Sequence, residues 1–237
     1  MWEFETHVAE IIQRTPSIKT FRFYTDGGSV RYRPGQFLFV TIKVGGEEAV
    51  HHFTISSSPT EKGILEFTKR ITASDYSRAL DAMQPGAWAR LRGPSGDFTL
   101  PVKPRKLGFL SGGIGITPLR SMLRYIIDRR LAHDVVLLYA NNTYSDIAFR
   151  EELDYFARAH KGIRVEHVIS GPEFPPDWTG KRGYISKDLV VELIPDYAER
   201  IFYLSGPPRM VFSLEEQLKS LNTPDEQVKR DYFPGYD

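Results

Sequence analysis

The sequence contains no cysteine among its 237 residues. Disulfide bonds, zinc sites built from thiolates and a cysteine-ligated iron–sulfur cluster within this chain are therefore excluded. It also lacks an excess of either charge, because 31 Lys and Arg stand against 30 Asp and Glu, for a formal net charge of +1. Such a chain has no broad positive field to hold a polyanion, so nucleic acid is not an expected partner.

Long apolar runs are also missing. No stretch reaches the roughly eighteen uncharged apolar residues of a membrane-spanning helix, and three glutamates among the first ten residues argue against a secretory signal. We therefore expect a cytoplasmic protein without membrane insertion. No metal site is expected, because four of the six histidines are scattered without metal-ligand spacing. These four are His7, His133, His160 and His167.

The first part of the chain, up to about residue 102, has short alternating apolar runs bounded by Gly, Pro, Asp or Ser. The runs cover residues 21–24, 36–44, 64–69 and 88–91. Short strands at close spacing are typical of a barrel or sandwich. One helix is expected among them, beginning after Ser74 as its N-cap and stopped by Pro85 and Gly86.

The second part has a different pattern. Continuous apolar runs at residues 107–110, 135–140, 165–169 and 201–204 alternate with helical patterns at 118–130 and 149–160. Continuous runs indicate strands buried on both faces, and their alternation with helices predicts a parallel sheet with right-handed crossovers. We therefore predict two domains, an antiparallel β-barrel or sandwich over residues 1–102 and an α/β dinucleotide-type domain with a parallel sheet over residues 103–237.

A glycine-rich turn follows the first of these buried runs. It contains Gly112, Gly113 and Gly115 and leads through Thr117 and Pro118 into a helical pattern. Glycines let a backbone turn tightly and approach a ligand, proline fits a first helical turn, and free N–H groups at a helix start attract a pyrophosphate. The spacing is not the usual Gly-x-Gly-x-x-Gly, so a tight turn without a ligand is the alternative.

Four further segments occur in a defined order. They are residues 33–37 (RPGQF), 51–57 (HHFTISS), 93–98 (GPSGDF) and 205–210 (SGPPRM). Together with the glycine turn they resemble, over nearly the whole chain, the ferredoxin–NADP reductase family of flavoproteins in its short bacterial form without an iron–sulfur domain. Each motif alone is weak, and the ordered set is specific.

The resemblance implies that the first domain is an antiparallel Greek-key β-barrel and the second an α/β nucleotide-binding domain. It also implies that FAD, rather than FMN, binds in the barrel. Phe53 would lie against the isoalloxazine ring, and the Thr54 hydroxyl would face flavin N5, the atom that accepts hydride. Lys69 and the segment 74–77 would approach the phosphates, although a solvated lysine beside an ordinary helix cap is the alternative. The implied flavin contacts are His51, Phe53, Thr54, Phe67, Thr68, Lys69, Ser74 and Ser77.

Three positions depart from the family pattern. His51 stands where the family has an arginine that clamps the flavin diphosphate, and a histidine is shorter and only partly charged near neutral pH. We expect weaker flavin binding unless Arg70, Arg78 or His52 substitutes. Ser74 replaces a glycine, and Ser205 replaces a cysteine beside the nicotinamide while keeping a polar hydrogen.

NADH or NADPH is the implied co-substrate. Gly112, Gly113, Gly115, Thr117 and Pro118 would face its pyrophosphate and nicotinamide, opposite Ser205, Gly206 and Pro207. Thr54 and Ser205 would touch the reacting rings.

The loop after residues 135–140 has no arginine before Arg150 to hold a 2′-phosphate, which favours NADH. In the tail, Phe233 and Tyr236 would cover the flavin or its adenine, a loose terminus being the alternative.

The implied reaction is hydride transfer from NAD(P)H to FAD in a cleft between the domains, followed by electron transfer to an external acceptor such as a ferredoxin or an oxygenase protein. No protein acid or base is needed, because the cofactor carries the chemistry and the protein aligns the rings. Two alternatives remain. One is a reductase that uses free flavin as substrate, which His51 favours, and the other is a non-catalytic subunit that senses nucleotide. The sequence names neither the acceptor nor the oligomeric state.

Overall fold

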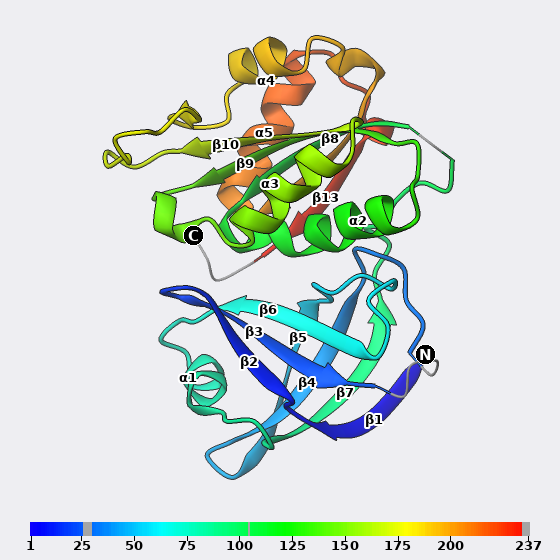
Figure 1. The fold of residues 1–237 in the computed structure, drawn as a ribbon, viewed down its shortest axis with the longest axis vertical. Helices are drawn as coiled ribbons and strands as arrows, with labels where there is room; N and C mark the ends of the chain where they lie inside the picture. The colour runs from blue at the N-terminus through cyan, green and yellow to red at the C-terminus, as the bar shows by residue number, and fades with distance from the viewer. Residues whose placement is uncertain (26–29, 104, 234–237) are drawn as a thin grey trace. The chain divides into compact units, whose positions relative to one another are not determined.

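The computed structural model describes residues 1–25, 30–103 and 105–233 (Figure 1). It contains two compact units. The first unit comprises Met1–Leu100 and Thr117–Tyr125, and the second comprises Pro101–Ile116 and Ile126–Asp237. A short helical segment from the middle of the chain therefore packs with the first unit.

Two antiparallel sheets form the first unit. The four-stranded sheet has the order β1 (Trp2–His7), β7 (Trp88–Ser95), β4 (Phe37–Val44), β5 (Glu47–Thr54), and the three-stranded sheet has the order β2 (Glu10–Thr15), β3 (Ile18–Tyr24), β6 (Ile64–Arg70). An isolated bridge between Ile55 and Phe67 joins them. Strands far apart in the chain, such as β1 and β7, are neighbours, and the predicted antiparallel architecture is confirmed.

Alternation in the strands builds the core of this unit. Along β4 every second side chain is buried, and Leu38 and Val40 point inward with the rings of β3 and β6. Phe67 stacks on Phe21 with ring centroids 5.0 Å apart and lies 6.0 Å from Phe23. Burial of such large apolar side chains contributes about 1.5–3 kcal/mol each.

The one α-helix expected among these strands is present as α1 (Asp75–Ala82). Its N-cap is Ser74, as predicted, with the side-chain oxygen accepting a hydrogen bond from the Ser77 amide at 3.3 Å. Tyr76 and Leu80 form the buried stripe that faces the strands. The cap therefore fixes where the helix begins, and its apolar stripe fixes which side is buried.

The second unit contains a six-stranded sheet in which all pairs are parallel. Its order is β11 (Lys181–Arg182), β10 (Ile163–Ile169), β9 (Asp134–Asn141), β8 (Lys106–Gly112), β12 (Ile201–Gly206), β13 (Val228–Tyr232). The buried run of β8 explains its central place, since a strand covered on both faces reads as continuously apolar. The predicted parallel α/β architecture is confirmed.

Helices cover the sheet of the second unit on both faces. α4 (Lys187–Leu193) and α5 (Pro208–Ser220) share one apolar cluster with β8, β9 and β12, while α3 (Arg150–Ala159) packs beside β10 on the other face (Figure 1). The longer helix α2 (Ile116–Asp128) follows β8 directly. Short 3-10 turns complete the described elements: η1 (Gly113–Gly115), η2 (Tyr144–Asp146), η3 (Tyr197–Glu199) and η4 (Asp225–Gln227).

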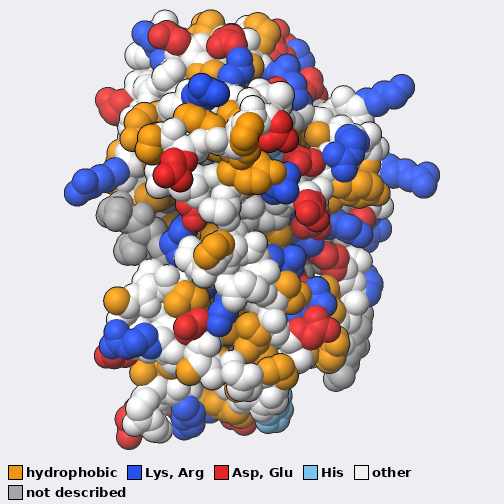
Figure 2. Space-filling model, turned by 60° about the vertical axis from the view of Figure 1, so that its left-hand side comes forward, with side chains coloured by type: hydrophobic (Ala, Val, Ile, Leu, Met, Phe, Trp, Pro, Cys, Tyr) orange, Lys and Arg blue, Asp and Glu red, His pale blue; other side chains and the backbone are white. Residues whose placement is uncertain are grey.

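The surface shows no strong bias of charge. On the face seen in Figure 2, basic and acidic side chains lie interspersed with apolar ones, as the net charge of +1 leads one to expect. Among the helices of the described ranges, none combines the length and the apolar character that a membrane crossing requires.

Candidate functional site

The end of β5 sends alternate side chains to opposite sides of the strand. His51 and Phe53 lie on the side where both contact Tyr76 of α1. His52 faces the other side, with its ring 5.3 Å from Phe37. His52 therefore lies on the side of the strand away from Tyr76, and its role as a substitute for the missing arginine stays a prediction.

The residues predicted to hold the flavin come together around this strand end. We call His51, Phe53, Lys69 and Tyr76 the aromatic–lysine cluster. The rings of His51 and Tyr76 lie 4.2 Å apart, and Lys69 Nζ lies 5.9 Å above the ring of Phe53. Phe53 is half-buried and stacks on Phe67 at 4.7 Å and 13°, so a planar apolar surface continues into the core.

Lys69 is the unusual member of the cluster, because it is a cation with only 7% of its surface exposed. Its ammonium group donates to the Arg70 carbonyl at 3.1 Å, and burial lowers its pKa to about 8. A buried charge is costly, and an anion beside it would offset that cost. The site therefore fits the negatively charged diphosphate of a flavin dinucleotide.

His51 contributes little charge to this site. Burial lowers its pKa below the ordinary value, and the positive charge of Lys69 lowers it further. Both effects favour the neutral imidazole, so Lys69 is the main cation of the cluster. Of the remaining predicted substitutes, Arg70 donates to the Ser17 hydroxyl at 2.9 Å, and Arg78 bonds the Asp75 carboxylate.

Ser74 and Ser77 shape the loop that precedes α1. The Ser77 hydroxyl is buried and accepts a hydrogen bond from the Thr72 amide at 2.7 Å, while Ser74 is exposed and caps the helix. Both residues therefore have a structural role without a ligand. Their contact with flavin phosphates stays a prediction.

Phe67 and Thr68 commit their side chains to the core. The Thr68 hydroxyl lies between the hydroxyls of Thr20 at 2.8 Å and Ser56 at 2.9 Å. Their assignment to the flavin stays a prediction that would need their backbone atoms. Thr54, by contrast, ends β5 opposite Phe37 and is buried.

In the second unit, the glycine turn meets the end of β12. A Cβ atom on Gly115 would lie 2.3 Å from the Ser205 carbonyl oxygen, and one on Gly112 would lie 2.2 Å from Met210 Sδ. Packing alone therefore explains these two glycines, whether or not a ligand binds. Gly113 is half-exposed with a φ of +53°. The structure thus brings the turn and the segment 205–210 together, as the sequence predicts for a dinucleotide site.

Two buried serines lie side by side at this sheet edge. Ser111 of β8 and Ser205 of β12 are paired in register and share a face of the sheet. Both are fully buried, and neither hydroxyl has a hydrogen-bond partner among the described residues. An unmade buried hydrogen bond costs about 1–3 kcal/mol, so the pair is a polar, unsatisfied spot at the carboxyl ends of β8 and β12.

The sequence analysis missed Ser111 and also Asp231. Asp231 of β13 is in register with Ser205, and burial raises its pKa to about 7. The signal for Ser111 was available, since Leu-Ser-Gly occurs at 110–112 and again at 204–206, each time at the end of a buried run. Tyr76 was visible only as part of a helical pattern.

The remaining predicted residues are placed around these segments. Thr117 and Pro118 are buried in the first turn of α2, and Pro207 is the N-cap of α5. Phe233 donates its amide to the Gly206 carbonyl at 3.0 Å. Tyr236 lies outside the described residues.

The loop after β9 borders a cavity of about 280 Å³ in the second unit. Two of its walls are Tyr144 and Trp178, whose rings are 5.8 Å apart, and the Arg150 guanidinium stacks 4.6 Å from the Tyr144 ring. Asp154, Glu166 and Asp177 also line it. Carboxylates outnumber the one arginine in this lining.

Comparisons with known proteins agree with both units. Residues 5–100 match the oxidoreductase FAD-binding domain, and residues 109–216 match the oxidoreductase NAD-binding domain. The chain is 33% identical over 216 residues to a glycine betaine monooxygenase reductase subunit of Chromohalobacter salexigens, covering 89% of this chain and 59% of that relative. It is 30% identical to NADH-cytochrome b5 reductase 1 of Pyricularia oryzae, covering 92% and 74%.

Among solved structures, the chain resembles a ferredoxin NADP+ reductase from Neisseria gonorrhoeae with bound FAD and NADP. The TM-score is 0.81 at 20% identity, and the match covers 97% of this chain and 98% of that one. The chain spans about 59% of the length of the first curated relatives it matches.

These matches define a protein with one FAD-binding and one NAD-binding domain of the oxidoreductase type. The chain belongs to the ferredoxin–NADP reductase-like family of FAD- and NAD(P)-binding oxidoreductases. The resemblance found in the sequence motifs is confirmed.

Proposed function

We propose that this chain is an NAD(P)H-dependent flavoprotein reductase, which takes a hydride from a reduced nicotinamide dinucleotide onto FAD and passes the electrons to a separate acceptor. The observation that carries the proposal is the presence of both cofactor domains in one chain. The curated relatives support an external acceptor, because one is the reductase subunit of a monooxygenase and another is a cytochrome b5 reductase. An oxygenase or another small redox protein is the acceptor class we infer.

The residues of the chain act in this proposal by binding and orienting. Lys69 would neutralise the flavin diphosphate, and Phe53 would support the flavin ring through the stack that continues to Phe67. The Thr54 hydroxyl would face flavin N5. Flavin supplies the hydride-accepting and electron-releasing chemistry when bound. No side chain in the cluster has to move a proton for this reaction.

In the second unit, Ser111 and Ser205 would hold the carboxamide of the nicotinamide at the carboxyl edge of the sheet. The pyrophosphate would lie against Gly113 at the start of α2. The domain division at residues 102 and 103 and the flavin-proximal tail with Phe233 and Tyr236 are further parts of the proposal.

NADH is the donor we favour over NADPH. Arg150 already contacts the Tyr144 ring and lies 4.0 Å from Asp154. The neighbouring carboxylates would repel a 2′-phosphate, and an arginine fork that is already engaged is a poor clamp for one. Comparing kcat/KM for the two donors tests this choice.

The test of the proposal is anaerobic reduction. Protein reconstituted with FAD is mixed with NADH or NADPH without oxygen, and bleaching of the oxidised flavin absorbance is followed in time. We expect complete bleaching with at least one donor. A flavin-loaded protein that keeps its oxidised spectrum with both donors contradicts the proposal.

A second candidate is a reductase that takes free flavin as a substrate. The neutral His51 in place of a clamping arginine favours it, because one anchoring charge for the diphosphate is lost. Gel filtration of the loaded protein separates the two. Stoichiometric flavin in the protein peak supports the resident cofactor, and a colourless peak with retained activity supports the substrate role.

A further inference from the structure

The segment that follows Thr54 is held by side chains of α2. The Ser121 hydroxyl donates to the Ser57 carbonyl at 2.6 Å, and Arg120 Nη1 donates to the Ser56 carbonyl at 3.0 Å. Residues Thr117–Tyr125 of α2 belong to the first unit, so these bonds lie within one compact body. The backbone beyond β5 is therefore fixed from outside its own sheet.

Arg120 also forms a buried ion pair with Glu61. Only 5% of the Arg120 side chain is exposed, and its guanidinium bonds both carboxylate oxygens, with Nη2 to Oε1 at 3.0 Å. Glu61 Oε2 in turn accepts the Ser58 amide at 2.6 Å. One planar fork thus connects a helix, a loop carboxylate and the Ser56 carbonyl beyond the end of β5, which a point charge such as lysine cannot reproduce.

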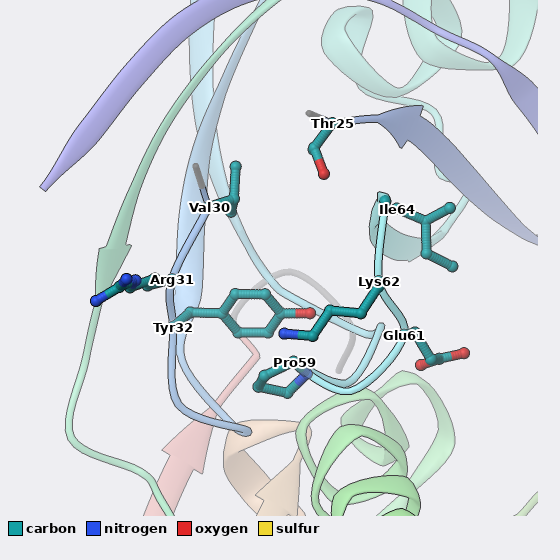
Figure 3. A pocket seen from close by; sticks show the side chains of 9 residues that line it. Thr25, Val30, Arg31, Tyr32, Pro59, Glu61, Lys62 and Ile64 are labelled. Carbon is teal, nitrogen blue, oxygen red and sulfur yellow. The ribbon is translucent and has the colours of Figure 1, made fainter. Parts of the chain in front are cut away.

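Tyr32 secures the same segment from another direction. Its hydroxyl bonds the carbonyl and the hydroxyl of Ser57, each at 3.1 Å, and burial raises its pKa, so it stays a protonated donor. In Figure 3 Tyr32 extends across a cavity of about 200 Å³ toward the loop that carries Pro59, Glu61 and Lys62. The Ser57 carbonyl therefore accepts two side-chain hydrogen bonds.

A glycine of another sequence motif packs closely against α2. Gly35, in the segment 33–37, has a φ of +96°. A Cβ atom there would lie 2.4 Å from Met122 Cε and 2.1 Å from the Phe98 carbonyl oxygen. Segments 33–37 and 51–57, noted first for their resemblance to flavin motifs, thus also contact this helix.

We infer that Arg120 is a positioning residue, which with Glu61 and Ser121 fixes the start of α2 relative to Thr54. The inference rests on the proposed function. Thr54 precedes Ser56 by two residues, about 7 Å of extended chain, and Thr117 precedes Arg120 by less than one helical turn, about 5 Å. The residues expected at the two redox rings are therefore joined through a few short, buried bonds.

Small displacements matter for such a reaction. Reacting atoms must approach to about 3–3.5 Å, and a misplacement of about 1 Å can lower a rate by about a hundredfold. Loss of the fork at position 120 should thus reduce the limiting rate of flavin reduction more than it reduces NADH affinity.

The experiment compares Arg120→Lys with a matched control, Arg200→Lys. Arg200 is equally buried, with 5% of its side chain exposed, and bonds both oxygens of Asp196 and two backbone carbonyls, of Leu107 and Asp134. It lies at the starts of β8 and β9, the sheet edge opposite the glycine turn. Ser121→Ala and Glu61→Gln serve as milder variants should Arg120→Lys fail to fold.

Two readouts are needed. The first is the limiting rate of anaerobic flavin reduction at saturating NADH, together with the melting temperature. We expect Arg120→Lys to lower this rate tenfold to a hundredfold. Arg200→Lys should lower the melting temperature by a similar amount but keep the rate within twofold of the wild-type rate. Equal rates in the two variants would make the Arg120 pair merely structural and overturn the inference.

The second readout uses the flavin-free protein and hydrogen exchange. Arg120→Lys or Ser121→Ala should speed amide exchange in residues 55–61 and 117–122 together. Faster exchange confined to α2 would mean that the helix does not hold the strand segment, which also overturns the inference. If neither donor reduces the wild-type protein, the proposed function is refuted instead. The exchange result still decides whether Arg120 and Ser121 hold residues 55–61 against α2.

Discussion

The two units prepare for a ligand in opposite ways. In the first unit the aromatic–lysine cluster is filled with side chains that contact one another, and its cost lies in one buried cation, Lys69. In the second unit glycines leave the turn without side chains, and the free-energy cost lies in the unmade hydrogen bonds of Ser111 and Ser205. The difference teaches that a charged ligand group and a polar, neutral one are matched by different arrangements of protein side chains.

The largest expected effect concerns the backbone contact that shapes the second unit. Gly115→Ala would drive a Cβ atom to 2.3 Å from the Ser205 carbonyl oxygen, where neither atom can yield cheaply. We expect a loss of more than about 4 kcal/mol in the free energy of unfolding, measured by urea denaturation. Gly183→Ala is the control, since open space surrounds that position and only its φ of +97° is strained. Equal stability of the two variants would contradict this view of the turn.

The next effect is a pH dependence centred on Asp231. Its pKa is raised to about 7 by burial, so between about pH 4 and pH 7 the folded state holds a proton that the unfolded state has lost. The free energy of unfolding should therefore fall as the pH rises through this window, by at most about 1.4 kcal/mol per pH unit. Asp231→Asn should flatten the profile, and Glu173→Gln, at an exposed loop position, should not.

Lys69 should show the opposite kind of titration in the first unit. Its pKa is lowered to about 8, so between about pH 8 and pH 10.5 the unfolded state binds the extra proton and stability rises with pH. Lys69→Met should stabilise the flavin-free protein at pH 7 by up to about 3 kcal/mol and weaken FAD binding at least tenfold. Thermal unfolding at pH 7 measures the stability of the flavin-free protein, and titration calorimetry with FAD measures the affinity. Unchanged FAD affinity, as expected for the exposed Lys62→Met, would remove Lys69 from the site.

The smallest expected effect is a change in stability that has opposite signs in the two units when a serine hydroxyl is removed. Ser205→Ala removes a hydroxyl without a hydrogen-bond partner in the part of the chain that the structure describes, so we expect the ligand-free protein to gain about 1–2 kcal/mol while its affinity for NADH falls. Ser56→Ala, in the first unit, removes a hydroxyl bonded to Thr68 and should lose about 1 kcal/mol. Both signs are measurable by thermal unfolding. A loss of stability in Ser205→Ala would show that its hydroxyl is already satisfied.

Much of the fold was predictable, because its elements carry local signals. The continuous runs that became β8, β9, β10 and β12, and the capped helix α1, were located from periodicity and Ser74 alone. β1 and β2 were not, since their residues are mostly half-buried and rich in charge, which weakens the apolar pattern. The two-residue strand β11 exists only through its pairing with β10 and has no local signal.

The candidate site was predictable only where one motif carries it. The glycine turn and the cluster of His51, Phe53 and Lys69 come from short segments whose residues are near each other in the chain. Arg120 and Glu61 are 59 residues apart, and Asp231 joins Ser205 only through strand register. Such pairings arise from tertiary packing, which a single sequence does not display.

The adjacent histidines of β5 give the protein a pair of internal magnetic resonance probes. Because the strand turns His51 toward Tyr76 and His52 toward Phe37, one imidazole borders the proposed flavin surface and its neighbour does not. On titration with FAD, the ring-proton resonances of the first should move while those of the second stay nearly still. One spectrum would then report both occupancy and the side of the strand on which the ligand sits.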